Sequence, residues 1–147
     1  MKNHIMRSIA ILGLFFMPAI ASVNAQTSSR VEVNIPFDFS AGKATLKAGS
    51  YSIKRTSGNL LAIRSADGKT TALVNAPLSV GSRDSKAGER LVFNQYGDQY
   101  FLSQVWMSVD SGRQIFTSGA EAKVARDYKL ANNNAKPRRV EIAMHSR

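Results

Sequence analysis

The sequence predicts an all-β fold, an antiparallel meander of about eight short strands that forms a small barrel or a two-layer sandwich, with one α-helix before the last strand. Apolar and polar residues alternate from Arg30 to Phe39, which is the period of a strand with one buried face. Further β-prone runs are joined by short glycine-containing turns, such as Asp67-Gly68 and Gly97-Asp98. One segment alone, beginning at Ser118, combines a capping signal with helical spacing.

The N-terminal residues indicate a cleaved signal peptide spanning residues 1–25. Lys2 and Arg7 give a positive start, and a short apolar run extends from Ile9 to Phe16. Small residues precede a cleavage site after Ala25, with Ala21 as the second choice. The apolar run is too short to cross a bilayer comfortably, which disfavours a retained anchor. The sequence therefore predicts export to the periplasm or the extracellular space, with no transmembrane span after cleavage.

Residues 26–147 are expected to form a single β-rich domain. A chain of this size supports one hydrophobic core. It contains no cysteine, so burial and strand pairing must stabilise it without disulfides. The full chain has a formal net charge of +10.

The first predicted strand runs from Arg30 to Phe39. Pro36 has no N–H to donate, so this strand is expected at a sheet edge or to carry a bulge. After a turn at Ala48-Gly49, a second strand is expected in which side chains again alternate between the two faces, with Tyr51 and Ile53 facing inward.

Two hairpins are expected next. A three-residue loop at residues 57–59 would place Ile53 opposite Ile63, with Gly58 or Asn59 in the left-handed conformation. Asp67-Gly68 then joins strands at residues 60–65 and 70–75. Residues 76–88 have little pattern and are expected to form a mobile surface loop.

Residues 89–107 predict a central hairpin that turns at Gly97-Asp98 and places Phe93 opposite Leu102 and Leu91 opposite Gln104. One face would then carry Leu91, Phe93, Tyr100, Leu102 and Trp106, and the other Val92, Phe101, Val105 and Met107. Because both faces are partly apolar, we expect packing on both sides of this hairpin. A turn at residues 110–112 leads into a further strand at residues 113–117.

The predicted helix begins with a capping box. The Ser118 hydroxyl would accept from the N–H of Glu121, and the Glu121 side chain would reach back to the N–H of Ser118. An apolar stripe made of Ala120, Val124, Tyr128 and Ala131 is suited to lying across a sheet. The asparagines at residues 132–134 end the helix, and alternation from Arg138 to Met144 predicts the final strand.

Signals for catalysis are few. After signal cleavage the only histidine is His145, near a chain end where fraying is common, and without cysteine no Cys and His metal site can form. No cofactor is expected. A hydrolase with an unrecognised carboxylate pair, drawn from acids such as Asp38 and Glu141, is the least favoured hypothesis.

The aromatic residues allow two interpretations. Tyr51, Phe93, Tyr96, Tyr100 and Trp106 are candidates for binding a small apolar ligand inside a lipocalin-like barrel. The alternative is that they fill the core of a small sheet protein. Tyr96 and Tyr100 flank the turn and are expected to be the most exposed of the set.

Basic residues suggest a polyanion partner. Outward positions of one sheet would gather Lys54, Arg64 and Arg139 into a patch that attracts an anionic polysaccharide or another envelope component. A dispersed, solvated basic surface is the alternative. Specific recognition of nucleic acid is not expected, because export separates the chain from the genome.

Two segments carry a family resemblance. The stretches VNIPFDFSAGKATLKAGSYSI and LVFNQYGDQYFLSQVW, within residues 31–144, resemble a group of small exported proteins of environmental bacteria, mostly of unassigned function. The NIPFDF and YGDQYFL pieces are the most distinctive. Lys47 stands where the group would have proline before Ala48-Gly49. The resemblance implies a secreted β-rich domain and brings no catalytic residues. Together these observations predict an exported, non-enzymatic binding or structural module with a basic outer face, with an apolar-ligand barrel as the alternative.

Overall fold

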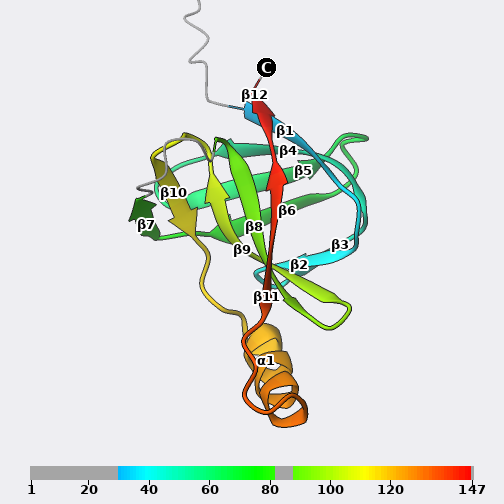
Figure 1. Ribbon diagram of the computed structural model, residues 1–147. Helices are drawn as coiled ribbons and strands as arrows, with labels where there is room; N and C mark the ends of the chain where they lie inside the picture. Colours follow the sequence, from blue (N-terminus) through cyan, green and yellow to red (C-terminus); the bar gives the residue numbers. More distant parts are fainter. Residues whose placement is uncertain (1–29, 82–87, 147) are drawn as a thin grey trace, which may run out of the picture.

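A computed structural model describes residues 30–81 and 88–146 of the 147-residue chain. The expected signal peptide at residues 1–25 lies outside the described residues. The described strands form two sheets that face each other as a two-layer sandwich (Figure 1), so the sandwich and not the closed barrel is the observed form of the predicted all-β fold.

The two sheets have five and seven strands. The five-stranded sheet has the order β12 (His145–Ser146), β1 (Arg30–Ile35), β4 (Gly49–Arg55), β5 (Leu60–Ser65) and β6 (Thr71–Asn75). The seven-stranded sheet has the order β11 (Arg138–Ala143), β8 (Arg90–Tyr96), β9 (Gln99–Trp106), β10 (Ser111–Gln114) and β7 (Leu78–Gly81), with β2 (Phe39–Ala41) and β3 (Ala44–Leu46) attached beside β9. Pairing is antiparallel throughout except between β2 and β9, which are parallel at Ser40 and Phe101.

The hydrophobic core lies between the sheets. Alternate residues of β1 and β4 point into it, among them Val33, Ile35 and Ile53, which are almost fully buried. Leu91 and Phe93 of β8 close it from the other sheet with no exposed surface. Burying side chains of this size contributes about 1.5–3 kcal/mol each, so the facing sheets supply the main stabilisation of the fold.

The first predicted strand is two strands. β1 ends at Ile35, before Pro36, and the chain then crosses to the other sheet, where Phe39 begins β2. The prediction of one strand from Arg30 to Phe39 was therefore wrong, because proline cannot continue the hydrogen-bonded ladder. The alternation of apolar and polar residues continues through Phe39 although the chain changes sheets, because both sheets face the same core. Phe39 is accordingly buried.

The hairpins of the five-stranded sheet follow the predicted registers. Ile53 lies opposite Ile63, with Gly58 in the left-handed region at φ 63°. Gly68 takes a φ of 72° in the turn between β5 and β6. Local turn chemistry therefore sets the pairing of β4, β5 and β6.

The β8–β9 hairpin carries a bulge that changes its faces. Phe93 lies opposite Leu102, as predicted, but Val92 then lies opposite Gln104 and leaves Ser103 as an extra residue in β9. The predicted pairing of Leu91 with Gln104 was wrong, because the bulge places Val105 opposite Leu91.

The extra residue reverses which side chains point inward beyond it. Val105 joins the core cluster with Leu91, Phe93 and Leu102, and Met107 packs against that cluster. Trp106 pairs with Arg90 and lies on the outer face of the sheet, where the guanidinium is 4.3 Å from the ring centroid. The predicted division of the hairpin into two faces is therefore correct up to Leu102 and inverted after it.

Residues 76–88 are not wholly a loop. Leu78–Gly81 form β7, which pairs with β10 at the edge of the seven-stranded sheet. This part of the loop prediction was wrong, and residues 82–87 lie outside the described residues. β10 likewise begins at Ser111, before the position expected for it.

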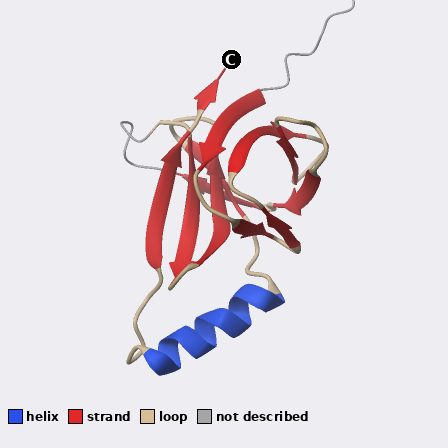
Figure 2. Cartoon of the chain, turned by 90° about the vertical axis from the view of Figure 1, so that its right-hand side faces the viewer, coloured by secondary structure: helices blue, strands red, loops and turns tan. Residues whose placement is uncertain are grey.

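Helix α1 (Gly119–Ala131) projects beyond one end of the sandwich (Figures 1 and 2). The Ser118 hydroxyl accepts from the N–H of Glu121 at 3.1 Å, as predicted. The Glu121 carboxylate, however, turns to the sheet and accepts from the Asn94 side chain at 2.9 Å, so its predicted return to the cap was wrong. The expectation that the apolar stripe lies across a sheet was also wrong, since Ala120 and Ala131 at its ends are exposed.

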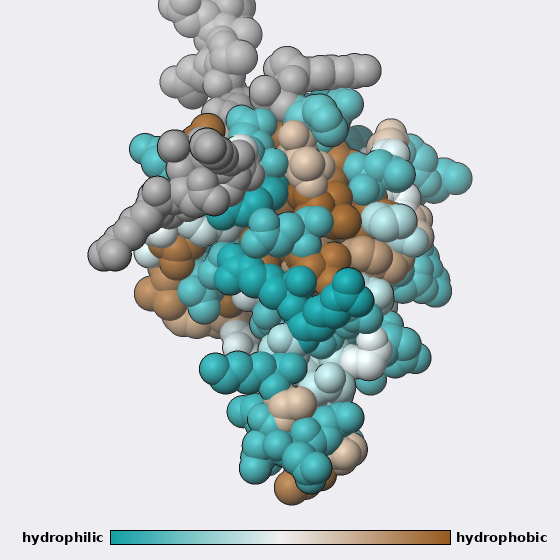
Figure 3. Space-filling model, viewed as in Figure 1, coloured by the Kyte–Doolittle hydropathy of each residue, from teal (hydrophilic) through white to brown (hydrophobic). Residues whose placement is uncertain are grey.

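The surface of the projecting helix is mostly hydrophilic, whereas hydrophobic surface gathers on the flank of the sandwich where β7 lies (Figure 3). Exposed apolar side chains of the sandwich and its connections include Leu73, Leu78 and Phe116.

Candidate functional site

Two of the five candidate aromatic residues belong to the core. Tyr51 and Phe93 are buried and make edge-to-face contacts with Phe39, at ring-centroid distances of 5.4 Å and 5.5 Å. The Tyr51 hydroxyl donates to the Lys47 carbonyl at 2.6 Å. Burial, followed by the charge of Asp38, raises the pKa of Tyr51 above its ordinary value. Both rings are thus used in packing the sandwich.

Of the other three candidate aromatic residues, Tyr100 packs against the core cluster, whereas Tyr96 and Trp106 lie outside it. Tyr100 stacks on Phe37 with ring centroids 3.8 Å apart, and Trp106 lies on the outer face of the seven-stranded sheet. Tyr96 was expected to be exposed, but it is only 7% exposed because it packs edge-to-face on Tyr128 of α1. The five aromatic residues are therefore divided between the core and an outer face and do not surround one cavity.

The candidate cations are also divided. Lys54 of β4 and Arg64 of β5 are exposed on the outer face of the five-stranded sheet. Arg139 is on β11, in the other sheet, where it donates to Gln104 and to Glu141. The prediction that all three gather on one sheet was wrong, because β11 pairs with β8 and not with a strand of the five-stranded sheet.

Arg30 takes the place that Arg139 was expected to fill. Arg30 begins β1 and lies directly opposite Lys54 in the β1–β4 ladder. Arg64, one strand further, lies opposite Ser52 and therefore diagonal to Lys54. The alternation that began at Arg30 already placed its side chain outward, so the signal was present in the sequence. What the pattern lacked was the pairing of β1 with β4.

This face carries the three cations Arg30, Lys54 and Arg64 together with one carboxylate, that of Glu32, which is two residues from Arg30 on β1. No ion pair joins Arg30, Lys54 or Arg64 to a carboxylate of the described residues. Like charges directly opposite each other destabilise a sheet by roughly 0.2–1 kcal/mol. Arg30 and Lys54 thus oppose folding slightly, and an anion placed between them would relieve that repulsion.

The guanidinium of Arg64 is held against the turn that follows β5. A Cβ on Gly68 would lie 2.9 Å from its Nη2 atom, so the guanidinium lies close to this turn, and the φ of 72° at residue 68 favours glycine. The Asp67 carboxylate accepts from the Ser65 hydroxyl and from the N–H of Lys69, and these bonds lower its pKa below the ordinary value. The turn therefore keeps Asp67 ionised, with its hydrogen bonds directed to the turn itself.

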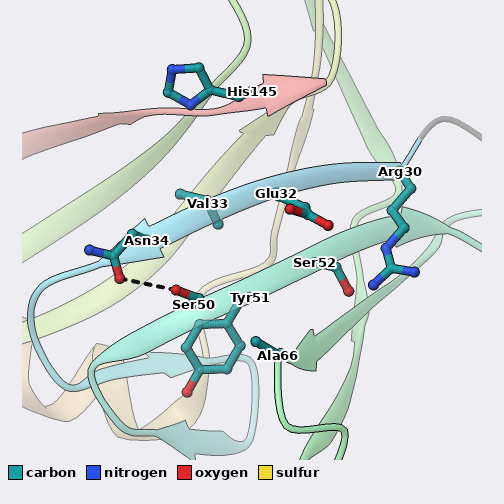
Figure 4. A pocket seen from close by; sticks show the side chains of 9 residues that line it. All are labelled: Arg30, Glu32, Val33, Asn34, Ser50, Tyr51, Ser52, Ala66 and His145. Carbon is teal, nitrogen blue, oxygen red and sulfur yellow. Dashed lines mark hydrogen bonds between the residues drawn. The ribbon is translucent and has the colours of Figure 1, made fainter. Parts of the chain in front are cut away.

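A polar depression of about 480 Å³ adjoins these cations (Figure 4). Its polar lining comes from β1, β4 and β12 and consists of Arg30, Glu32, Asn34, Ser50, Ser52 and His145. Figure 4 shows Arg30 at one end and Asn34 with Ser50 at the other, where the Ser50 hydroxyl donates to the Asn34 amide oxygen at 3.4 Å. Because one cation, one carboxylate and several hydroxyl and amide groups line it, the depression suits a polar ligand that forms hydrogen bonds.

The two acids considered for a hydrolase are both in ion pairs. Asp38 contacts the Lys47 ammonium at 2.8 Å, and Glu141 contacts Arg90 at 3.3 Å and Arg139 at 3.2 Å. Both acids thus form contacts between neighbouring segments of the fold.

Comparison with protein-family models, with curated proteins and with solved structures found no match. In the part of the chain that the structure describes, no helix is both long enough and apolar enough to cross a membrane.

Proposed function

We propose that this chain is an exported, non-enzymatic binding module that holds an anionic polymer, such as an acidic polysaccharide of the envelope, on the outer face of its five-stranded sheet. The observation that carries the proposal is the placement of Arg30 opposite Lys54, with Arg64 on the next strand. We call these three residues the basic face. Export is the part of the proposal that rests on residues 1–25.

The shape of the face supports a polymer more than a small enclosed ligand. The basic face crosses three neighbouring strands, β1, β4 and β5, and neighbouring strands lie about 4.8 Å apart. Several charges in a row can contact successive anionic groups of one chain. The polar depression beside Arg30 adds hydroxyl and amide groups for hydrogen bonds to sugar hydroxyls.

Retention on a sulfated-polysaccharide resin tests the proposal. The double variant Lys54→Glu and Arg64→Glu should elute at clearly lower salt than the wild type, because attraction between exposed charges is screened by salt and lost on charge reversal. The matched control is Lys123→Glu with Lys129→Glu, which changes the net charge equally on the exposed surface of α1. If both double variants lose the same retention, net charge alone explains binding and the basic face has no special role.

A further inference from the structure

Among the described strands, β6 has one edge that no other strand covers. β6 is the last strand of the five-stranded sheet and pairs with β5. Bonds beyond both strand ends fix which way its backbone groups point, since Ser65 N–H donates to the Thr70 carbonyl and Ala76 N–H donates to the Asn59 carbonyl. In an antiparallel ladder the residues that bond to the partner strand alternate. Even-numbered residues of β6 therefore face β5.

It follows that the N–H and C=O groups of Thr71, Leu73 and Asn75 point away from β5, toward the free edge. Among residues 30–81 and 88–146, no strand pairs with this edge. A row of unpaired backbone donors and acceptors is a template for one more strand.

The edge also lacks the devices that usually block such pairing. The sequence of β6, TALVN, contains no charged residue and no proline, and Leu73 at its centre is 65% exposed. Edge strands that stay unpaired commonly carry lysine, proline or a bulge. Here Lys69 and Pro77 lie outside the strand at either end, so the segment between them is open to an added strand.

A groove of about 660 Å³ runs beside this edge. Its other walls are the β2–β3 turn at residues 42–44 and the segment from Ile115 to Gly119 that leads from β10 into α1. Phe116 in that segment is 57% exposed. An added strand would direct alternate side chains into this groove, where apolar groups would be covered by Phe116 on one side and Val74 on the other.

The charge of the groove selects the kind of peptide. Lys43 is the one charged residue among the described groove residues, and the whole chain has a formal net charge of +10. We propose that the free edge of β6 binds an extended, acidic peptide segment of a partner protein by strand addition, with apolar side chains at alternate positions and a carboxylate near Lys43.

The test uses a synthetic octapeptide in which valine alternates with glutamate and threonine. Titrated into the full chain after signal cleavage, it should shift the amide signals of residues 71–75 and slow their hydrogen exchange. A matched peptide with N-methyl groups on alternate backbone nitrogens keeps the side chains but cannot complete the ladder. It should bind at least ten-fold more weakly, and equal binding of the two peptides overturns strand addition.

Two substitutions at Leu73 separate the backbone from the side chain. Leu73→Pro removes an outward-pointing N–H without breaking a bond to β5, so the fold should persist while octapeptide binding falls at least ten-fold. Leu73→Ala keeps the donor and should weaken binding less. Lys43→Glu should favour a lysine-containing octapeptide over the glutamate-containing one. Undiminished binding by a folded Leu73→Pro variant overturns the proposal.

Self-pairing is the competing occupant of this edge. If the wild type elutes as a dimer and Leu73→Pro as a monomer, the edge belongs to a second copy and the peptide proposal is wrong. Retention of the Leu73→Pro variant on the sulfated resin should match the wild type, because the basic face does not use the Leu73 N–H. The two proposals can therefore fail independently.

Discussion

The carboxylate of Glu121 in α1 accepts a hydrogen bond from the side-chain amide of Asn94 in β8 at 2.9 Å. The Tyr96 hydroxyl reaches the same carboxylate oxygen at 3.4 Å, and Glu121 is only 5% exposed. The Tyr96 ring also packs on Tyr128, with ring centroids 5.7 Å apart. Since α1 projects from the sandwich (Figure 2), these few side chains attach the helix to the sheet.

The first prediction concerns this attachment. Glu121→Ala should loosen the helix, because a hydrogen bond to a charged group contributes about 1.5–3 kcal/mol and its loss leaves Asn94 without that acceptor. Hydrogen exchange of the helix amides at residues 122–130 should become faster, while the amides of β4 and β5 keep their protection. Glu121→Gln retains an acceptor oxygen and should have an intermediate effect.

Lys123→Ala is the control for the helix itself, because Lys123 is exposed and alanine preserves helix propensity. It should leave exchange in α1 almost unchanged. Equal exchange rates in Glu121→Ala and the wild type would mean that the helix is attached by other contacts.

The second prediction concerns the packing of Trp106 on Gly112. These residues lie opposite each other in β9 and β10, and a Cβ on Gly112 would lie 2.5 Å from the indole ring. Gly112→Ala should therefore displace the ring and lower the free energy of unfolding by about 1–3 kcal/mol, measured by urea denaturation. Gly119→Ala is the matched control, since nothing lies within 4 Å of its Cβ position. A Gly112→Ala variant as stable as the control would contradict this packing.

Much of the fold could be predicted because local turn chemistry fixes register. The opposition of Ile53 and Ile63 follows from the loop at Gly58, and the helix start follows from Ser118. The bulge at Ser103 could not be predicted in the same way. Val105 and Trp106 are both apolar, so their pattern does not distinguish which one faces the core.

The candidate site was likewise predictable where a local turn joins its strands and not where distant strands pair. Lys54 and Arg64 were predicted correctly as outward-facing neighbours, because one short hairpin joins their strands. Arg139 was placed in the wrong sheet because alternation within a strand says nothing about which distant strand it pairs with. Arg30 was missed for the same reason, since its position opposite Lys54 depends on the pairing of β1 with β4.

The third prediction is a loss of stability at alkaline pH that depends on Tyr96. Burial, followed by the negative charge of Glu121, raises the pKa of the Tyr96 phenol above the ordinary value of 10.0. A raised pKa in the folded state stabilises the fold below the unfolded value, and this stabilisation disappears as pH rises through the folded value. Tyr96→Phe should therefore lose less stability between about pH 9 and 12 than the wild type does. The measurement is the midpoint of thermal unfolding of both proteins across this pH range. If the two midpoints fall in parallel as pH rises, the prediction is wrong.

The fourth prediction concerns Asp38, which holds the crossing from β1 to β2 against the start of β4. Its carboxylate accepts from the Lys47 ammonium and from the N–H of Ala48, each at 2.8 Å. These two bonds, that from Lys47 first, lower the pKa of Asp38 below its ordinary value of 3.8. We expect part of the acid sensitivity of the fold to come from this residue.

The direction of the pH dependence follows from the linkage between protonation of Asp38 and folding. A carboxyl group whose pKa is depressed by folding stabilises the fold above its unfolded value, and this contribution disappears as pH falls through the depressed folded value. Asp38→Asn retains an oxygen that can accept from Ala48 but loses the charge that attracts Lys47. Its midpoint of thermal unfolding should therefore depend less on pH than that of the wild type below about pH 4, and the two should converge at the acid end. Lys47→Gln removes the cation instead and should also reduce the pH dependence of the unfolding midpoint in this range. If both variants keep the pH dependence of the wild type, other carboxylates cause the loss of stability in acid.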